Sequence, residues 1–373
     1  MHKVAIVGAG KIGSMIAELL GRSGDYQVAV LDRSAEALAR LETSVPVERM
    51  ELDVADGQAL RSALDGRFAV LSAAPYQLTT RVAEAARSAG AHYLDLTEDV
   101  ASTRRVKQLA EEATSAFIPQ CGLAPGVITI VAADLCKRFE VLHDVRMRVG
   151  ALPKYPSNAL NYNLTWSTDG LINEYCEPCE AIVDGQPREV PALEEREEFS
   201  LDGVLYEAFN TSGGLGTLCE TLDGKVSELN YKTIRYQGHR EYAWFLVNEL
   251  HLGDERKLFK ELLERAIPIT FQDVVVIFCT VSGWRDGQLV QVSDARKIYN
   301  ATLIDNEWSA IQITTAAGVC TMVDLHYQGR LASRGFACQE QVSLREFLSN
   351  RFGRVYASDQ EPASLPSFSA GLS

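Results

Sequence analysis

The chain has 373 residues, of which 46% are hydrophobic and 23% are charged, as in an ordinary soluble globular protein with more than one domain. Its net charge of −14 repels nucleic-acid phosphates, so nucleic-acid binding is not expected. No apolar stretch approaches the ~18 residues that span a bilayer. We expect no signal peptide, since the run Lys3–Val7 and a glycine turn follow Met1 closely. Eight cysteines are too few for a disulfide scaffold. We therefore expect a cytoplasmic protein with reduced thiols, no membrane attachment and no metal site.

The first ~125 residues alternate apolar runs of strand length with helical patterns. The predicted strands cover residues 4–7, 28–31, 69–73, 93–96 and 117–119. The predicted helices lie between them, at residues 13–23, 35–41, 58–64, 79–89 and 100–114. This alternation is typical of a parallel sheet with helices on both faces. We predict an α/β fold, with a doubly wound Rossmann domain over residues 1–125.

The pattern changes after residue 126. Apolar runs there predict strands at residues 127–133, 145–149, 159–166, 229–236, 274–282 and 311–315. We predict a second, α+β domain over residues 126–334, with a mixed or antiparallel sheet that shapes a substrate pocket. The segment from about 335 to 373, with a helix over 343–352, is expected to pack back on the first domain. Its end, residues 358–373, is rich in Ser and Pro.

A glycine-rich turn follows the first predicted strand. Gly8, Gly10 and Gly13 form the G-x-G-x-x-G pattern between a strand and an apolar-faced helix. The first glycine allows the tight turn, the second allows a pyrophosphate to approach the backbone, and the third allows close packing of helix and strand. The helix N-terminus offers N–H donors, which places Lys11 and Ile12 in the predicted dinucleotide site as well.

Asp32 ends the second predicted strand, about twenty residues further on. A carboxylate at this position accepts hydrogen bonds from the ribose hydroxyls of NAD and repels the extra phosphate of NADP. The neighbouring Arg33 favours the opposite choice, since arginine pairs with that phosphate. We predict NAD as the cofactor.

Two further segments fit a dinucleotide site. Asp53 and Val54 end a third strand-like segment, where the carboxylate suits the exocyclic amine of adenine. Small residues end the fourth strand on the nicotinamide side, namely Ala73, Ala74 and Pro75. Each segment is equally consistent with small residues that fill a tight strand end.

Polar side chains follow three consecutive strands, where the pocket of an open parallel sheet lies. They are Tyr76, Asp95, Glu98 and Cys121, which we take as candidate catalytic residues. Each also has a structural interpretation: an aromatic cap for Tyr76, a helix N-cap for either acid, and a small buried hydrophobe for Cys121.

Several segments together resemble the saccharopine dehydrogenase-like family of NAD(P)-dependent amine oxidoreductases, and within it the lysine 6-dehydrogenases. The more particular ones are T-S-G-G-L-G-T and Y-K-T-I-R-Y-Q-G-H, in which Gln237 replaces an expected proline. The segments lie at residues 8–13, 73–76, 93–97, 121–126, 211–217 and 231–239.

The resemblance implies hydride chemistry on a C–N bond of a small amino acid, and assembly into a homodimer or larger homo-oligomer. A lysine 6-dehydrogenase transfers hydride from the ε-carbon of L-lysine to NAD, and water opens the imine to the semialdehyde and ammonia; the product then cyclises. Alternatives are a saccharopine or carboxynorspermidine-type dehydrogenase acting on a secondary amine, and a non-catalytic NAD-binding protein. Residues 151–250 carry 17 acidic and 7 basic side chains, which favours a diamine over tricarboxylic saccharopine. We expect most of these acids, such as those of 194–198, on a solvated helix.

Within these segments Arg235 is the natural partner for a carboxylate, because its planar fork matches two oxygens. On an extended strand His239 would share its face, whereas Lys232 would point to the other face and is the weaker candidate. The glycine-rich loop would present N–H and hydroxyl groups to substrate, and we include its first three residues, Thr211, Ser212 and Gly213. The general base remains open between Asp95, Glu98 and a water linked to Tyr76.

Overall fold

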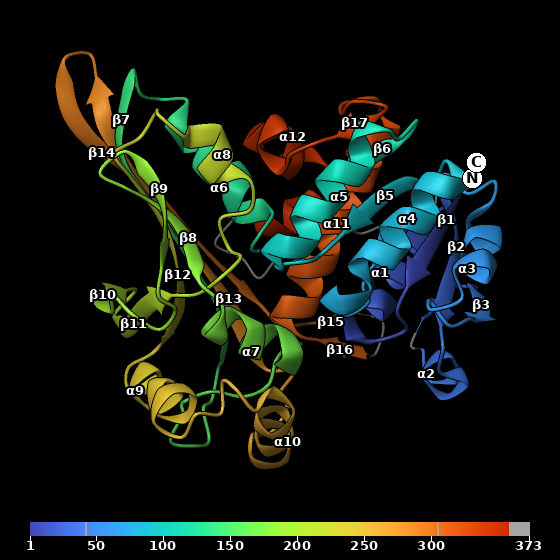
Figure 1. The fold of residues 1–373 in the computed structure, drawn as a ribbon, viewed down its shortest axis with the longest axis horizontal. Coiled ribbons are helices and arrows are strands. Elements are labelled where there is room, and N and C mark those ends of the chain that lie inside the picture. The colour runs from blue at the N-terminus through green and yellow to red at the C-terminus, as the bar shows by residue number, and fades with distance from the viewer. Residues whose placement is uncertain (42, 304–305, 358–373) are drawn as a thin grey trace. The chain divides into compact units, whose positions relative to one another are not determined.

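The computed structural model describes residues 1–41, 43–303 and 306–357 and divides the chain into two compact units (Figure 1). Unit 1 comprises Met1–Gly126 and the chain from Gln312 onward, and unit 2 comprises Val127–Ile311. The second boundary therefore lies well before residue 334, where the sequence placed it, because it falls inside helix α11 (Ala310–Tyr327). Residues 358–373, the end of the expected C-terminal segment, lie outside the described residues.

The described part of unit 1 holds a sheet of seven strands. They are β1 (His2–Val7), β2 (Tyr26–Asp32), β3 (Glu48–Glu51), β4 (Ala69–Ser72), β5 (His92–Asp95), β6 (Ala116–Ile118) and β17 (Gly335–Phe336). All neighbouring strands pair in parallel, in the order β17-β6-β5-β4-β1-β2-β3. The chain moves outward from β1 to β3 and then returns to β4 on the other side of β1. Ligands of open α/β sheets bind at such a reversal, beside the carboxyl ends of the strands.

Helices cover both faces of this sheet, as the alternating pattern predicts. They are α1 (Lys11–Arg22), α2 (Ala35–Ala39), α3 (Gly57–Leu64), α4 (Thr79–Ala89), α5 (Val100–Glu111) and the 3₁₀ turn η1 (Tyr76–Leu78). Three begin at side-chain caps, Ser34 for α2, Asp56 for α3 and Asp99 for α5, which accept from free N–H groups of the first turn. Apolar residues of α3, α4 and α5 form one core with alternate residues of the strands, and α1 packs against β1 and β2.

The C-terminal segment of unit 1 returns to this sheet. In addition to α11 it contains β17, η3 (Gln339–Gln341), α12 (Leu344–Ser349) and η4 (Gly353–Tyr356). In Figure 1 the red β17 lies beside the cyan β6, with which it pairs.

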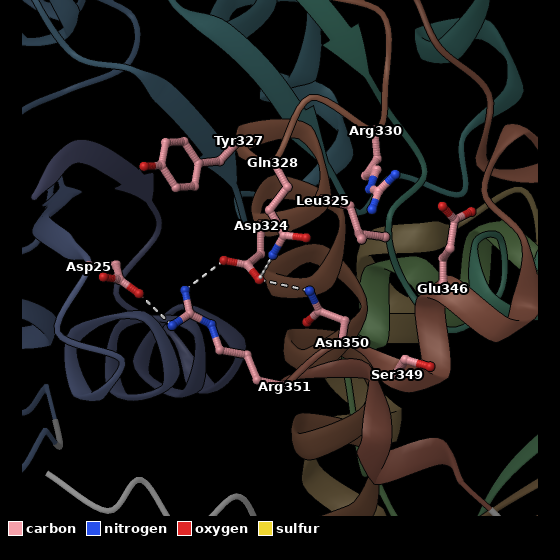
Figure 2. A pocket seen from close by; sticks show the side chains of 10 residues that line it. All are labelled: Asp25, Asp324, Leu325, Tyr327, Gln328, Arg330, Glu346, Ser349, Asn350 and Arg351. Atoms are coloured by element: carbon pink, nitrogen blue, oxygen red, sulfur yellow. Dashed lines mark hydrogen bonds and ion pairs between the residues drawn. The ribbon is translucent and has the colours of Figure 1, made fainter. Parts of the chain in front are cut away.

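A polar hollow of about 440 Å³ lies between the start of β2 and this segment (Figure 2). Asp324 of α11 is 1% exposed and accepts hydrogen bonds from Tyr26, Gln328, Asn350 and Arg351 at 2.6–2.9 Å. This cluster of hydrogen bonds joins segments that are about 300 residues apart in the sequence.

Unit 2 is built on an eight-stranded mixed sheet within its described residues. The strands are β7 (Val141–Pro153), β8 (Cys179–Val183), β9 (Gln186–Val190), β10 (Glu197–Leu201), β11 (Val204–Asn210), β12 (Glu228–Tyr236), β13 (Asp273–Arg285) and β14 (Gln288–Tyr299). The main order is β10-β11-β12-β7-β13-β14, with β8 and β9 attached to β12. Only the β12–β7 pair is parallel among the described pairings of this sheet. A separate hairpin joins β15 (Ala301–Leu303) and β16 (Asn306–Trp308).

The two faces of this sheet differ. On one face Phe199 of β10 stacks on Phe278 of β13 at 5.6 Å, although three strands lie between them, so the sheet is strongly curled. The helical elements of unit 2 are α6 (Val127–Cys136), α7 (Thr168–Cys176), α8 (Leu218–Leu222), α9 (His239–Trp244), the π-helical turn η2 (Phe245–Glu249) and α10 (Arg256–Ala266). Residues of α7, α9 and α10 form a core with Phe209 of β11, on the opposite face. The predicted combination of a parallel Rossmann-like sheet and a second domain with a mixed sheet is confirmed.

Four local predictions were wrong. Residues 127–133 and 311–315 belong to helices α6 and α11, because an apolar run buried on most sides carries no period that separates strand from helix. Residues 159–166 are irregular apart from one bridge, Leu164 to Ile269. Residues 194–198 are not a solvated helix: the segment enters β10, and several of its acids pair with basic side chains.

Candidate functional site

In unit 1 the glycine turn has the geometry of a phosphate-binding turn. Gly8 has φ of +108°, a left-handed conformation that favours glycine, and a Cβ on Gly13 would lie 1.9 Å from the Gly8 carbonyl oxygen. A Cβ on Gly10 would meet nothing within 4 Å. Gly8 and Gly13 are therefore required by the turn itself, whereas Gly10 keeps open the space at the start of α1 that a pyrophosphate needs. Lys11 and Ile12 form the first residues of that helix.

Asp32 lies at the carboxyl end of β2 beside this turn. Its Oδ2 accepts from the Ala9 N–H at 2.8 Å, and its Oδ1 accepts from the Ser34 N–H at 2.9 Å. The carboxylate is half-buried and held next to the glycine turn, whereas Arg33 is exposed. This arrangement provides acceptors for ribose hydroxyls at the position where the sequence pattern required them.

The remaining nucleotide candidates lie at neighbouring strand ends. Asp53 is exposed and accepts from the Ala55 N–H at 2.8 Å, while Val54 is buried in the core beneath it. Ala73 approaches the glycine turn closely, since its carbonyl oxygen would be 2.8 Å from a Cβ on Gly8. Ala74 and Pro75 continue from it into η1.

Asp95 is a structural acceptor at the end of β5. It is buried and receives hydrogen bonds from the Tyr93 hydroxyl at 2.7 Å, the Gln120 N–H at 2.8 Å and the Thr97 N–H at 3.1 Å. Burial raises its pKa to about 6 although these hydrogen bonds lower it. Its oxygens thus join β5 to the loop after β6. The helix cap that the sequence suggested for Asp95 or Glu98 is instead Asp99.

Glu98 is the more available carboxyl of the two. It is half-buried, and burial raises its pKa to about 7, with further contributions from the negative charges of Asp99 and Asp95. A carboxyl with a pKa near neutrality is suited to general-base catalysis. Tyr76 is also half-buried and begins η1 at the end of the neighbouring strand β4.

Cys121 has the environment of a structural thiol. It is buried, its Sγ donates to the Ile118 carbonyl oxygen at 2.9 Å, and the Gln339 amide donates to it at 3.3 Å. Burial, followed by the charge of Asp95, raises the pKa of the thiol well above its ordinary value. The protonated, enclosed sulfur argues against the predicted catalytic role.

Arg235 is the central charged group on one face of the unit 2 sheet. It is 2% exposed, and its Nε donates to the Tyr175 hydroxyl at 3.0 Å. Its Nη1 donates to Thr233 Oγ1 and to the Ile234 carbonyl oxygen, both at 2.9 Å. The guanidinium carbon lies 5.0 Å from the Tyr162 ring centre. Within the described part of unit 2, its hydrogen bonds go only to neutral groups.

His239 is close to Arg235 for a reason that the sequence did not supply. The strand ends at Tyr236, and His239 begins α9, so the expected shared strand face does not exist. The two residues are instead linked by Tyr175 of α7, whose hydroxyl lies 2.9 Å from His239 Nε2. His239 Nδ1 lies 2.8 Å from the Leu160 carbonyl oxygen.

Lys232 lies on the other face of the sheet, as alternation along a strand requires. Its Nζ bonds to the Glu195 carbonyl oxygen and to Glu197 Oε2, at 2.5 and 3.3 Å, and Arg148 pairs with the same Glu197. Burial lowers the pKa of Lys232. The prediction that Lys232 shares a substrate site with Arg235 is therefore corrected: it belongs to a separate ion cluster inside the curl of the sheet.

The glycine-rich loop is tied to the helix that carries Tyr175. The Ser212 N–H donates to the Glu174 carbonyl oxygen at 3.0 Å, and its hydroxyl donates to the Pro178 carbonyl oxygen at 2.8 Å. Gly213 has φ of +85°. The buried hydroxyl of Thr211 makes no hydrogen bond to the described residues. An unpartnered buried hydroxyl is costly, so Thr211 is a candidate to contact a ligand.

Sequence reasoning missed Tyr175 and Tyr162. No motif distinguishes them, since both lie outside the recognisable segments and reach Arg235 only through tertiary packing. Among residues 1–41, 43–303 and 306–357, no three His, Cys, Asp or Glu side chains are grouped to hold a metal ion. Nor does that part of the chain contain a helix long and apolar enough to cross a membrane.

Comparison with known families covers almost the whole described chain. Residues 4–121 match the family model described as saccharopine dehydrogenase NADP binding domain, and residues 122–352 match the saccharopine dehydrogenase C-terminal domain. The chain belongs to the saccharopine dehydrogenase family. The resemblance inferred from the sequence motifs is thereby confirmed at the level of the family.

Individual relatives are distant. The chain is 21% identical over 191 residues to alpha-aminoadipic semialdehyde synthase of Mus musculus, covering 49% of this chain and 21% of that protein. It is 22% identical over 269 residues to saccharopine dehydrogenase [NADP(+), L-glutamate-forming] of Schizosaccharomyces pombe, covering 66% and 58%. The chain thus spans about a fifth to three fifths of the length of these curated relatives. The apo saccharopine dehydrogenase (L-Glu forming) of Saccharomyces cerevisiae shares the fold, with a TM-score of 0.76, 17% identity and coverage of 95% and 96%.

Proposed function

We propose that this member of the family is a dehydrogenase that oxidises the ε-amine of L-lysine with NAD, releasing ammonia and the semialdehyde. The observation that carries the proposal is Arg235, a buried cation whose hydrogen bonds go to neutral groups. The negative charge of the buried Glu174 acts on Arg235, but the hydrogen bonds of the guanidinium go to other, neutral groups. An anionic ligand in direct contact with the guanidinium would add a charge-assisted hydrogen bond, so an anion is the expected partner. An α-carboxylate meets that need by accepting from Nη2, since protein groups already occupy Nε and Nη1.

The charge inventory of unit 2 supports a substrate with one carboxylate. The other buried cations of its described residues are already paired with acids: Arg148 and Lys232 with Glu197, and Arg296 with Asp294. Saccharopine carries three carboxylates and lysine only one. Arg235 is thus the buried cation that unit 2 offers to a carboxylate, which favours the smaller amino acid.

The chemistry requires a base before hydride can leave. A nicotinamide held at the glycine turn of unit 1 would supply the acceptor for the hydride of the ε-carbon. Glu98 is our proposed base, since it can take a proton from the ε-ammonium group, whose nitrogen lone pair then forms the imine as hydride departs. Asp95 is the poorer candidate because three donors occupy its oxygens, and Cys121 because its thiol is protonated. Water adds to the imine, and ammonia leaves.

For the cofactor we propose NAD over NADP. The support is the half-buried Asp32 carboxylate next to the glycine turn, which would repel a 2′-phosphate. The matching family model and the relative from Schizosaccharomyces pombe carry NADP in their names, and Arg33 is exposed nearby. Both nucleotides therefore belong in the assay.

The second candidate is a dehydrogenase that makes or breaks a secondary amine, as the names of the relatives suggest. The decisive measurement is NADH or NADPH formation at 340 nm with L-lysine, L-ornithine, saccharopine or carboxynorspermidine, with ammonia assayed in parallel. Oxidation of lysine with one ammonia per reduced nucleotide supports the first proposal. Activity with saccharopine alone, without ammonia, would replace it with the second candidate. Arg235→Lys serves as the site control, since it keeps the charge but loses the Nη2 donor and the fixed plane of the guanidinium. We expect KM for the amino acid to rise about tenfold or more.

A further inference from the structure

We propose that Tyr175 is a positioning residue whose hydroxyl fixes the orientation of Arg235 and holds His239 as a neutral hydrogen-bond acceptor. The inference rests on the proposed function only where the carboxylate on Arg235 is taken to be that of the substrate. All the groups involved lie in unit 2, on the sheet face that packs against α7 and α9.

The hydrogen bonds permit one set of directions. The Leu160 carbonyl oxygen can only accept, so His239 Nδ1 carries the proton. In a neutral ring Nε2 then accepts, and the Tyr175 hydroxyl donates to it. Arg235 Nε can only donate, and the Tyr175 oxygen accepts from it. The result is a donor chain that runs from Arg235 through Tyr175 and His239 to Leu160.

The electrostatics are consistent with this chain. Burial, followed by the nearby charge of Arg235, lowers the pKa of His239 to about 3, so the ring stays neutral at any ordinary assay pH. Burial raises the pKa of Tyr175, so its hydroxyl keeps the proton that it donates. His239 is therefore an acceptor that anchors Tyr175, and not the base that removes a proton from the substrate.

The donor chain determines which nitrogen of Arg235 can bind a ligand. Tyr175 occupies Nε, and Thr233 with the Ile234 carbonyl oxygen occupies Nη1. The nitrogen left for a carboxylate is Nη2, with the plane of the guanidinium fixed between these partners and the Tyr162 ring. Without the Tyr175 hydroxyl the guanidinium could rotate, and the carboxylate would no longer bind to a guanidinium that is already correctly oriented.

The first test is kinetic, with Tyr175→Phe against Tyr236→Phe. The Tyr236 hydroxyl also donates a hydrogen bond, to the Pro153 carbonyl oxygen at 2.9 Å. Tyr236 and Arg235 are adjacent strand residues and therefore lie on opposite faces, so Tyr236→Phe is a matched control. We expect Tyr175→Phe to raise KM for the oxidised amino acid about tenfold, with kcat and KM for the nucleotide within about twofold. Tyr236→Phe should leave all three unchanged. Equal effects of the two variants would overturn the proposal.

The second test needs no substrate. Nitrogen-15 NMR of the six histidines, with His239→Gln to assign the signal, should give the Nδ1–H tautomer for His239 without titration from pH 5.5 to 8. In Tyr175→Phe the Nε2 resonance should shift because its donor is gone. Titration of His239 in this range, or an unchanged Nε2 resonance, would refute the donor chain. If no amine is oxidised by the wild-type protein, the proposed function fails, and this spectrum still decides the role of Tyr175.

Discussion

At the scale of single residues, the environment separates chemically similar candidates. Asp95 and Glu98 are three positions apart, yet Asp95 has three donors on its oxygens while Glu98 retains a pKa of about 7. The sequence could name both acids but could not rank them, because two of the three donors to Asp95 are the backbone N–H groups of Gln120 and Thr97, which only the fold brings to it. The same holds for Cys121, whose position was predicted and whose enclosure by Gln339 was not. Local sequence thus finds strand-end residues, and tertiary contacts decide their roles.

Glu98→Gln provides the first prediction. If Glu98 is the base, kcat/KM of the wild type should fall about tenfold per pH unit below pH ~7, as the carboxyl becomes protonated. In Glu98→Gln the rate should drop at least about a hundredfold at pH 8, and this inflection should vanish. A pH–rate profile of both proteins checks it. Retention of the inflection in the variant would transfer the role to another group.

The same carboxyl also predicts a stability effect, whose sign follows from the direction of its shift. Its pKa in the folded state, about 7, exceeds the unfolded value of about 4.3, so the folded protein holds the proton more tightly. This contribution to stability is complete below pH ~4 and is lost as the pH rises through 7. Glu98→Gln should therefore reduce the fall in unfolding free energy between pH 4 and 8, as measured by urea unfolding. If the unfolding free energy fell more steeply with pH in Glu98→Gln than in the wild type, this would contradict a pKa of Glu98 that burial raises.

Asp32 gives the third residue-scale prediction. Asp32→Ser keeps a hydroxyl acceptor but removes the charge that opposes a 2′-phosphate. We expect KM for NAD to rise about tenfold and KM for NADP to fall, so that the ratio of kcat/KM values moves toward NADP. Steady-state kinetics with both nucleotides measure this ratio, and Asp65→Ser serves as control because Asp65 is an exposed carboxylate at the C-terminal end of α3. An unchanged ratio would mean that Asp32 does not select the nucleotide.

At the scale of elements, the sequence predicted the strands and helices of residues 1–125 well, since each strand or helix is bounded by polar or glycine residues and buried on a defined face. It failed where an element is apolar on most sides. Residues 127–133 and 311–315 look like buried strands, but they lie in helices whose burial removes the helical period. In α11, Gly318 allows close packing, since a Cβ there would lie 2.5 Å from the Cys121 carbonyl oxygen. Such contacts cannot be read from the segment alone.

The β1–α1 turn supports a paired prediction at this scale. Gly13→Ala would place a Cβ 1.9 Å from the Gly8 carbonyl oxygen, so helix and strand must separate, at a cost of about 2 kcal/mol or more. Gly10→Ala meets no protein atom within 4 Å, so stability should change by less than about 1 kcal/mol. Nucleotide binding should nevertheless weaken at least tenfold in Gly10→Ala, because the methyl group occupies the space of the pyrophosphate. Thermal unfolding and nucleotide titration separate the effects, and an unstable Gly10→Ala would contradict this assignment.

At the scale of the whole molecule, the chain leaves unit 1 at Gly126 and returns to it at Gln312. The sequence predicted the return of a C-terminal segment but placed it too late, because the apolar start of α11 looked like a strand of the second domain. The donor chain in unit 2 could not be predicted from local sequence either, because α7, β12 and the first residue of α9 come together only in the folded protein. Motifs therefore identified the family, while long-range packing supplies the geometry on which specificity depends.

The Asp324 cluster shown in Figure 2 makes the last prediction, because it joins the two segments of unit 1. Asp324→Asn removes the buried charge beside Arg351. It also places the NH₂ donor of an amide next to side chains that are themselves donors, such as those of Tyr26 and Arg351. Breaking a buried pair costs about 3–5 kcal/mol, and we expect about 2–3 kcal/mol here, since Arg351 is partly exposed and keeps Asp25. Asp25→Asn is the control: its side chain is 53% exposed, so the loss should stay below about 1 kcal/mol. Urea unfolding followed in unit 1 measures the loss of unfolding free energy in both variants. The cluster lies at the start of β2, away from the glycine turn at the carboxyl ends of the strands, so both variants should retain the nucleotide affinity of the wild type. Similar losses for the two variants would mean that the segments are held together elsewhere in unit 1.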